Sequence, residues 1–377
     1  MYDFIIQYAV ETVNPVLVRR KNMEQRISFS CDYMEGAHPA ILQRLIGTNF
    51  TQMPGYGADD CCGSARAKIR AACGAPNAEI HFLVGGTQTN ATVIDALLRS
   101  YEGVIAADTG HISVHEAGAI EFGGHKVLTL PQENGKITAS QIRALLDQYE
   151  DDANRDHTVM PGMVYLSQPT EYGTLYSKKE LAAISALCRE KRLPLYIDGA
   201  RLAYALACPE NDVTLRDLAA LCDIFYIGGT KCGALLGEAV VIPQPGLIPH
   251  FFTIIKQHGA LLAKGRLLGL QFDTLFTDGL YARIGETAIR DANAIRDALR
   301  ANGYQLCFAS PTNQTFCLVD REQMEKLREY VDFSQWEVYD ETHTIIRFAT
   351  SWATKDEDVR TLCRVLRDCA AREKAAS

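Results

Sequence analysis

The chain has 377 residues, of which 47% are hydrophobic and 22% are charged, and this is enough for a large globular domain and a smaller one. The net charge of −8, with no long run of basic residues, argues against nucleic-acid binding, and no apolar run reaches the roughly 20 residues of a membrane span. The 12 cysteines include no Cys-x-x-Cys pair and no zinc-ligand spacing, so we expect a soluble cytoplasmic protein with reduced cysteines and no metal.

The N-terminal two thirds of the chain are predicted to form an arm and a large domain. We expect a helical arm at residues 1–26, then a large domain at 27–250 that begins with a short strand at Ile27–Asp32. Within this domain, buried strands and helices alternate from about residue 79 to 242. The strands are expected at 79–84, 103–107, 126–130, 159–166, 195–198, 224–227 and 238–242.

This alternation predicts an α/β fold, a mainly parallel sheet with helices on both faces. One helix start is marked locally, because Ser177-Lys-Lys-Glu180 fits a capping box. In sheets of this kind, ligands bind beyond the carboxyl ends of the strands. Residues that directly follow a predicted strand are therefore the candidates for a functional site.

The rest of the chain is predicted to form a linking helix at 251–285 and a small α+β domain at 286–377. Strands are expected near 315–319 and 344–348. The second of them, Ile345-Ile-Arg347-Phe348, places an arginine in an apolar strand. Arginine is rarely buried without a partner, so we expect Arg347 to meet an anion, either a protein carboxylate or a ligand.

A glycine-rich turn follows the first strand of the alternating region. Gly85-Gly86-Thr87 stands between this strand and an apolar helix. Unpaired N–H groups and the helix dipole favour an anion at such a place, so Gly86 and Thr87 are candidate phosphate ligands. An ordinary strand-to-helix turn is the alternative interpretation. The turn does not fit the Gly-x-Gly-x-x-Gly pattern of a nucleotide-binding oxidoreductase, which argues against that class and against a related non-catalytic binding protein.

His111 lies at the junction of the next strand and helix, and His115 and Glu116 follow it by about one helical turn. The flat imidazole of His111 could stack on an aromatic cofactor ring. His111 and His115 could also share a helix face and bind a metal, but no third ligand is evident.

Asp198 and Lys231 each follow a buried strand, and together they indicate a specific cofactor. A lysine held away from water has a lowered pKa, and its neutral amine can form a Schiff base with an aldehyde. A carboxylate at the end of the neighbouring strand can keep a pyridine nitrogen protonated. This pair is what pyridoxal phosphate (PLP) requires. Ser167 follows a strand too, so it is expected at the same edge of the sheet.

The chain from about residue 27 to 350 resembles the threonine aldolase branch of the β-eliminating lyases, which are fold-type I PLP-dependent enzymes like aspartate aminotransferase. The likeness is carried by His111-Ile-x-x-x-Glu116-Ala-Gly-Ala, by Asp198-Gly-Ala-Arg201 and by Thr230-Lys231. It implies that Lys231 is the Schiff-base lysine, Asp198 the pyridinium partner and His111 the stacking residue.

The resemblance also implies ligands for the substrate and an assembly. Arg201 and Arg347 would hold the substrate carboxylate, to which planar guanidinium donors are suited, and Ser167 is expected as a further substrate contact. The enzyme would be a homodimer or homotetramer with sites at the subunit interface. Lys256, Lys264 or Arg266 would then reach a neighbour's phosphate.

The expected reaction is cleavage of the Cα–Cβ bond of a β-hydroxy-α-amino acid to glycine and an aldehyde. His111, or a water held by His115 or Glu116, is the expected base for the β-hydroxyl proton. The loop at 168–173, Gln-Pro-Thr-Glu-Tyr-Gly, departs from the Asn- and His-rich loop of the family. Because of this loop, β-elimination, racemisation and transamination stay open as alternative PLP-dependent reactions.

Overall fold

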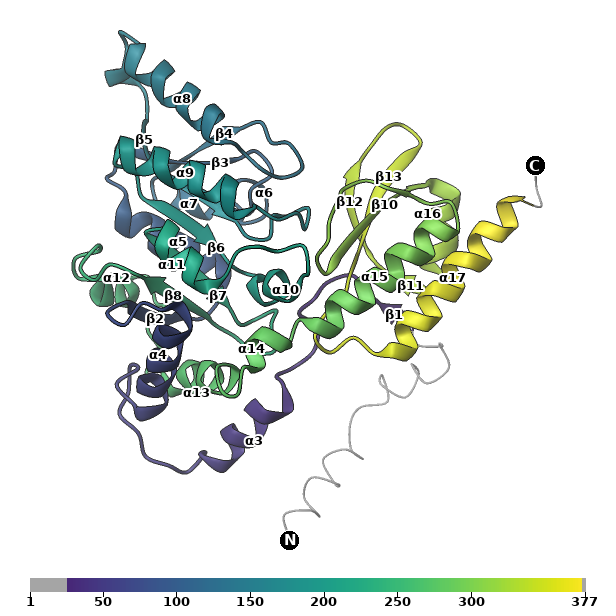
Figure 1. Cartoon of the computed structure of the whole chain (residues 1–377), viewed down its shortest axis with the longest axis horizontal. Coiled ribbons are helices and arrows are strands. Elements are labelled where there is room, and N and C mark those ends of the chain that lie inside the picture. The colour runs from purple at the N-terminus through teal and green to yellow at the C-terminus, as the bar shows by residue number, and fades with distance from the viewer. Residues whose placement is uncertain (1–25, 375–377) are drawn as a thin grey trace.

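The computed structural model describes residues 26–374, and it divides into a large and a small lobe (Figure 1). The arm predicted at 1–26 lies outside the described residues, except for Arg26. Within the described part of the chain, no helix has the length and apolar character that crossing a membrane requires.

The large lobe is built on a seven-stranded sheet of order β2-β8-β7-β6-β5-β3-β4. Only β8 runs antiparallel to its neighbours, β2 and β7, and the other adjacent pairs are parallel. This confirms the predicted mainly parallel sheet. The strands are β2 (Glu79–Leu83), β3 (Glu102–Ala107), β4 (Lys126–Leu130), β5 (Met160–Ser167), β6 (Leu195–Asp198), β7 (Ile224–Gly228) and β8 (Glu238–Ile242).

Helices cover both faces of this sheet, because successive strand residues are buried on opposite sides. In β7, Phe225 and Ile227 belong to one apolar cluster, and Ile224 and Tyr226 belong to the other. The first cluster is covered by α4 (Asp60–Cys73), α8 (Ala139–Asp151), α9 (Lys178–Lys191), α10 (Leu202–Ala207), α11 (Leu215–Leu221) and α13 (Arg266–Leu275). The second is covered by α5 (Gly86–Leu97), α6 (His111–Val114), α7 (Ala119–Phe122) and α12 (Phe251–Gln257).

Local signals in the sequence set several of these helix ends. The predicted capping box is present at the start of α9, where the Ser177 hydroxyl accepts from the Glu180 N–H and the Glu180 carboxylate accepts from the Ser177 N–H. Thr138 and Gln141 make the same arrangement at the start of α8. The remaining elements of this lobe are α3 (Pro39–Gly47) and a 3₁₀ turn at Arg155–His157.

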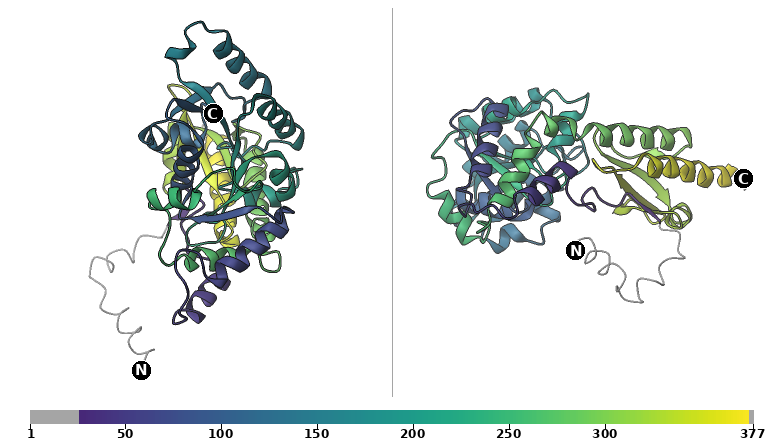
Figure 2. Two further views of the ribbon diagram at one scale, coloured as in Figure 1. Left: turned by 90° about the vertical axis from the view of Figure 1, so that its left-hand side faces the viewer. Right: turned by 90° about the horizontal axis from the view of Figure 1, so that it is seen from below.

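The small lobe has its own antiparallel sheet, of order β12-β13-β10-β9, and its own apolar core (Figure 2). Its sheet is formed by β9 (Gln305–Leu306), β10 (Gln314–Asp320), β12 (Ser334–Val338) and β13 (His343–Ala349). The helices of this lobe are α15 (Glu286–Ala301), α16 (Arg321–Arg328) and α17 (Asp356–Lys374).

Two details differ from the sequence-based expectation. The single linking helix expected at 251–285 is instead three helices, α12, α13 and α14 (Leu280–Arg283), because Gly259 and Gly279 adopt positive φ and interrupt the chain. The strand expected at Ile27–Asp32 is shortened to β1 (Ile27–Ser28), which pairs with β11 (Val331–Asp332). Phe29 joins the core of the small lobe. The start of the chain therefore packs with its C-terminal part.

Candidate active site

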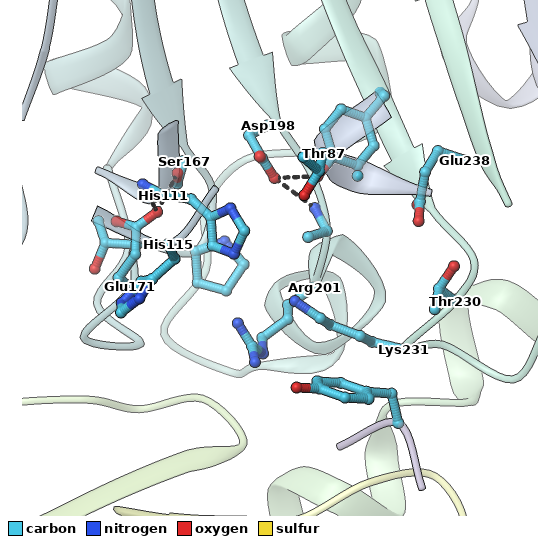
Figure 3. A pocket seen from close by; sticks show the side chains of 16 residues that line it. Thr87, His111, His115, Ser167, Glu171, Asp198, Arg201, Thr230, Lys231 and Glu238 are labelled. Carbon is cyan, nitrogen blue, oxygen red and sulfur yellow. Dashed lines mark hydrogen bonds between the residues drawn. The ribbon is translucent and has the colours of Figure 1, made fainter. Parts of the chain in front are cut away.

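A cavity of about 330 Å³ opens at the carboxyl ends of the parallel strands, and most of the predicted site residues line it (Figure 3). These are Gly86, Thr87, His111, Ser167, Asp198, Arg201 and Lys231. They come from distant parts of the sequence and meet because each follows a strand of the same sheet. Arg347, from the small lobe, is not among the residues that line the cavity.

Lys231 follows β7 after only two residues, Gly229 and Thr230. Burial lowers the pKa of the Lys231 amine, and the positive charge of Arg201 lowers it further, against the opposing effect of Asp32 and Asp198. Its Nζ lies 5.8 Å from the centre of the Tyr33 ring. The amine thus points into the cavity in a setting that favours its neutral, nucleophilic form.

Asp198 is buried at the end of β6, and its carboxylate accepts several hydrogen bonds. Tyr226 Oη donates to Oδ1 at 2.5 Å, and Tyr165 Oη donates to Oδ2 at 2.6 Å. Asn90 Nδ2 also donates to Oδ2, at 3.0 Å. Burial alone would raise the pKa of Asp198, but nearby His111 and these donors together hold it below its usual value. Asp198 is therefore kept as an anion.

His111 is oriented by a carboxylate that is itself closed off from water. His111 Nδ1 lies 2.6 Å from Glu116 Oε1, and Asn90 Nδ2 donates to the same oxygen at 2.7 Å. The Glu116 side chain is fully buried. Asn90 thus joins Glu116 to Asp198, and the His111 ring is fixed at the wall of the cavity.

The start of α5 forms an open anion site. Gly85, its N-cap, makes no side-chain cap, so the first N–H groups of the helix remain available. A Cβ at Gly86 would lie 3.2 Å from Tyr226 Oη, so a side chain there would crowd the cavity wall. This donor set fits a phosphate group, in agreement with the prediction for Gly86 and Thr87.

Glu238, at the start of β8, borders the same cavity on the side of Thr230, opposite His111 and Ser167 (Figure 3). Burial raises the pKa of Glu238 to about 8, although Thr230 and the Gly229 N–H act in the opposite direction. At neutral pH this carboxyl group is therefore largely protonated, and it adds no full negative charge beside the anion site.

The two arginines that are predicted to bind the substrate carboxylate lie at different depths. Arg201 borders the cavity and is held by Asp32, whereas Arg347 lies deeper and contacts Gln314 Oε1 at 2.9 Å and the Trp336 ring at 4.7 Å. Burial and the neighbouring positive charge of Arg201 lower the pKa of Arg347 to about 10. Arg347 Nε is buried and has no hydrogen-bond partner among the residues that the structure describes. The two neighbouring guanidinium groups of Arg201 and Arg347, together with the unpaired Nε–H of Arg347, suit an anionic ligand.

The comparisons with known proteins agree with this geometry. Residues 31–319 match the family model described as beta-eliminating lyase. The chain belongs to the beta-eliminating lyase family. It is 31% identical to the low specificity L-threonine aldolase of Pseudomonas sp. (strain NCIMB 10558), over 91% of this chain and 98% of that protein.

Two solved structures extend the comparison. A Leishmania major threonine aldolase superposes with a TM-score of 0.88 at 42% identity, covering 91% of this chain and 99% of the other. The aspartate aminotransferase of Thermus thermophilus has a TM-score of 0.67 at 17% identity, covering 94% of each chain, and shows the shared fold. The predicted family, the fold-type I architecture and a PLP-dependent lyase are thus confirmed.

Other predictions about residues around the site have different outcomes. Lys256, Lys264 and Arg266 do not line the cavity of their own chain, and Arg266 donates to backbone oxygens of Thr48 and Thr51. No cluster of metal-binding side chains occurs in the part of the chain that the structure describes, so His111 and His115 have no third ligand there.

Several functional candidates were missed in the sequence. Asp32, Glu171 and Glu238 all border the cavity or bind a residue that does. A local signal existed for two of them, since Asp32 ends a predicted strand and Glu238 begins an otherwise apolar one. Glu171 gave no such signal, because its position depends on the path of the loop after β5.

Proposed function

We propose that this chain cleaves the Cα–Cβ bond of a β-hydroxy-α-amino acid, in the manner of an L-threonine aldolase, to give glycine and an aldehyde. The observation that carries the proposal is that Lys231 and Asp198 line the same cavity. The pKa of the Lys231 amine is lowered, which favours its neutral form, and the pKa of Asp198 is lowered, which favours its anionic form. The Pseudomonas and Leishmania relatives are threonine aldolases by name, and this supports the same reaction.

Different residues of the cavity would hold different parts of the cofactor. Lys231 would hold the aldehyde carbon of PLP, and Asp198 would hold the pyridine nitrogen in its protonated form. Gly86, Thr87 and the first N–H groups of α5 would bind the phosphate. His111, oriented by Glu116, would stack on the ring. When bound, PLP supplies an acceptor for the electron pair of the broken bond.

The substrate would be held through its carboxylate. Arg201 and Arg347 are close enough for the charge of one to lower the pKa of the other, and this repulsion would be relieved by a bound anion. Fixing the carboxylate would orient the substrate, and His111, Ser167 and Glu171, which line one side of the cavity, would be the polar groups available to its β-hydroxyl group.

We also propose a homodimer or homotetramer in the cytoplasm. Ile46 lies in the last turn of α3 and Phe50 lies just after this helix, and their exposed fractions are 78% and 96%. Exposed apolar groups of this size suit a surface that a second copy covers. Lys256 and Lys264 are both exposed, although Lys256 Nζ lies 4.3 Å from the centre of the Tyr56 ring, and either lysine would be able to reach a neighbouring subunit.

The test is Lys231→Ala, with Lys179→Ala, an exposed residue of α9, as a matched lysine control. The wild type and the control should show the visible absorbance of lysine-bound PLP and release glycine from threonine, and Lys231→Ala should lose both. An unchanged spectrum in Lys231→Ala would contradict the cofactor assignment. If ammonia and a keto acid form in place of glycine, the reaction is one of the alternatives that the loop at 168–173 leaves open.

A further inference from the structure

The loop that follows β5 places one carboxyl group against the reaction cavity. Glu171 has an exposed fraction of only 7%, and it lines the cavity with Lys231 and Asp198. Its Oε1 accepts from Ser167 Oγ at 2.6 Å and from the His111 backbone N–H at 3.0 Å. Among the described side chains and backbone groups, no other residue donates a hydrogen bond to its Oε2, although the backbone N–H of Glu171 itself bonds to the carboxyl group and lowers its pKa.

The loop that carries Glu171 is fixed at several points. The Thr170 N–H donates to the Thr174 carbonyl at 2.9 Å, and the two threonine hydroxyls lie 2.7 Å apart. The Gln168 side chain binds both the N–H and the carbonyl of Tyr176. One carboxyl oxygen is therefore anchored and the other is presented from a rigid support, which is the arrangement that precise proton transfer requires.

The two carboxyl groups of the cavity differ in their preferred protonation state. Burial raises the pKa of Glu171 and the nearby Asp198 raises it further, although Ser167 and His111 act in the opposite direction. The pKa of Asp198 is lowered, as described above. Neighbouring carboxyl groups whose pKa values are pushed apart commonly have separate roles, one as a fixed charge and the other as an acid–base group.

The other candidate bases are less well placed than Glu171. Glu116 is fully buried behind His111, and its free Oε2 is closed off. His111 Nδ1 is hydrogen-bonded to Glu116, and the face of the His111 ring would be covered by the proposed stacking on the cofactor. His115 packs on the Trp336 ring at a centroid distance of 5.4 Å. Of these groups, Glu171 alone has an anchored carboxylate that lines the cavity and an oxygen to which no other described residue donates a hydrogen bond.

We infer that Glu171 is the catalytic base that takes the β-hydroxyl proton of the substrate, which rests on the proposed aldol cleavage. The substrate O–H bond breaks towards Glu171 Oε2, and its electron pair becomes the second C–O bond of the aldehyde. When the Cα–Cβ bond breaks, PLP held by Lys231 and Asp198 would supply the acceptor for its electron pair. Glu171 then releases its proton to solvent and a solvent proton reaches Cα, so glycine and aldehyde together contain the atoms of the substrate.

The decisive variant is Glu171→Gln, because the amide oxygen can still accept from Ser167 and from the His111 N–H. We expect kcat for threonine cleavage to fall by about 10²–10⁴-fold, with KM and the visible PLP spectrum little changed. Exchange of the glycine Cα hydrogen for deuterium, followed by NMR, involves no β-hydroxyl group and should keep its wild-type rate. A kcat within tenfold of wild type, or equal losses of cleavage and exchange, would overturn the assignment.

Ser167→Ala provides a second test, the pH dependence of kcat/KM, which would not change if Glu171 had only a structural role. The Ser167 hydroxyl lowers the pKa of Glu171, so its removal should shift the acidic limb of the kcat/KM profile to higher pH. An unshifted limb would contradict a role for Glu171 as base. If the wild type cleaves no β-hydroxy amino acid, the proposed function itself fails, whereas an active wild type with an equally active Glu171→Gln variant refutes only this inference.

Discussion

Asp32 accepts two hydrogen bonds from Arg201, one from Nε at 2.6 Å and one from Nη2 at 2.9 Å. Its carboxylate also accepts from Asn313 Nδ2 at 2.9 Å, and its side chain is fully buried. The loop after β1 thus reaches the large lobe and fixes the arginine that we propose for the substrate carboxylate. A bidentate contact of this kind holds the guanidinium plane in one orientation.

Asp32→Asn should destabilise the protein, because it leaves the Arg201 charge buried without its counterion. Breaking one side of a buried ion pair costs about 3–5 kcal/mol, measured as the free energy of unfolding in urea. The positive charges and hydrogen bonds around Asp32 hold its pKa far below the usual value of 3.8. The contribution of the ionised Asp32 to folding stability is therefore complete at neutral pH, and it is lost only as the pH falls below 3.8.

The matched control for Asp32→Asn is Glu190→Gln, which breaks the exposed pair of Glu190 with Arg143. Solvent screens that pair, so its loss should leave the unfolding midpoint unchanged. If the two variants have the same stability, the Asp32–Arg201 contact does not hold the fold.

Tyr226→Phe should move the acidic limit of PLP binding to higher pH. The Tyr226 hydroxyl donates to Asp198 and lowers its pKa, so removing it favours the protonated carboxyl group at a higher pH than in the wild type. A protonated Asp198 cannot keep the pyridine nitrogen charged. A spectrophotometric pH titration of the holoenzyme measures this limit, and a titration curve that coincides with the wild type would rule the effect out.

Glu238→Gln should flatten the dependence of apoprotein stability on pH. The pKa of Glu238 is raised from 4.5 to about 8, so the folded state retains a proton that the unfolded chain loses. Between these two values the wild type should lose stability as the pH rises, because the unfolded state binds fewer protons than the folded state. Urea unfolding at several pH values from 5 to about 8 checks this, and parallel curves for the two proteins would disprove it.

The sequence by itself determined the architecture and the chemical core of the site. Buried strands that alternate with helices allow few arrangements other than a parallel sheet, and Asp198 and Lys231 follow strands of that sheet directly. Their positions relative to the sheet edge are therefore local properties of the chain. The same holds for Gly86, Thr87 and His111.

The tertiary structure decided which other groups complete the cavity. Asp32 meets Arg201 across 169 positions of sequence, and Asn90 bridges Glu116 and Asp198 although 108 positions separate Asn90 from Asp198. Glu171 reaches the cavity only because the loop after β5 turns back towards His111. No periodicity or spacing encodes such contacts, because they depend on how strands and loops are brought together when the two apolar faces of the sheet are buried.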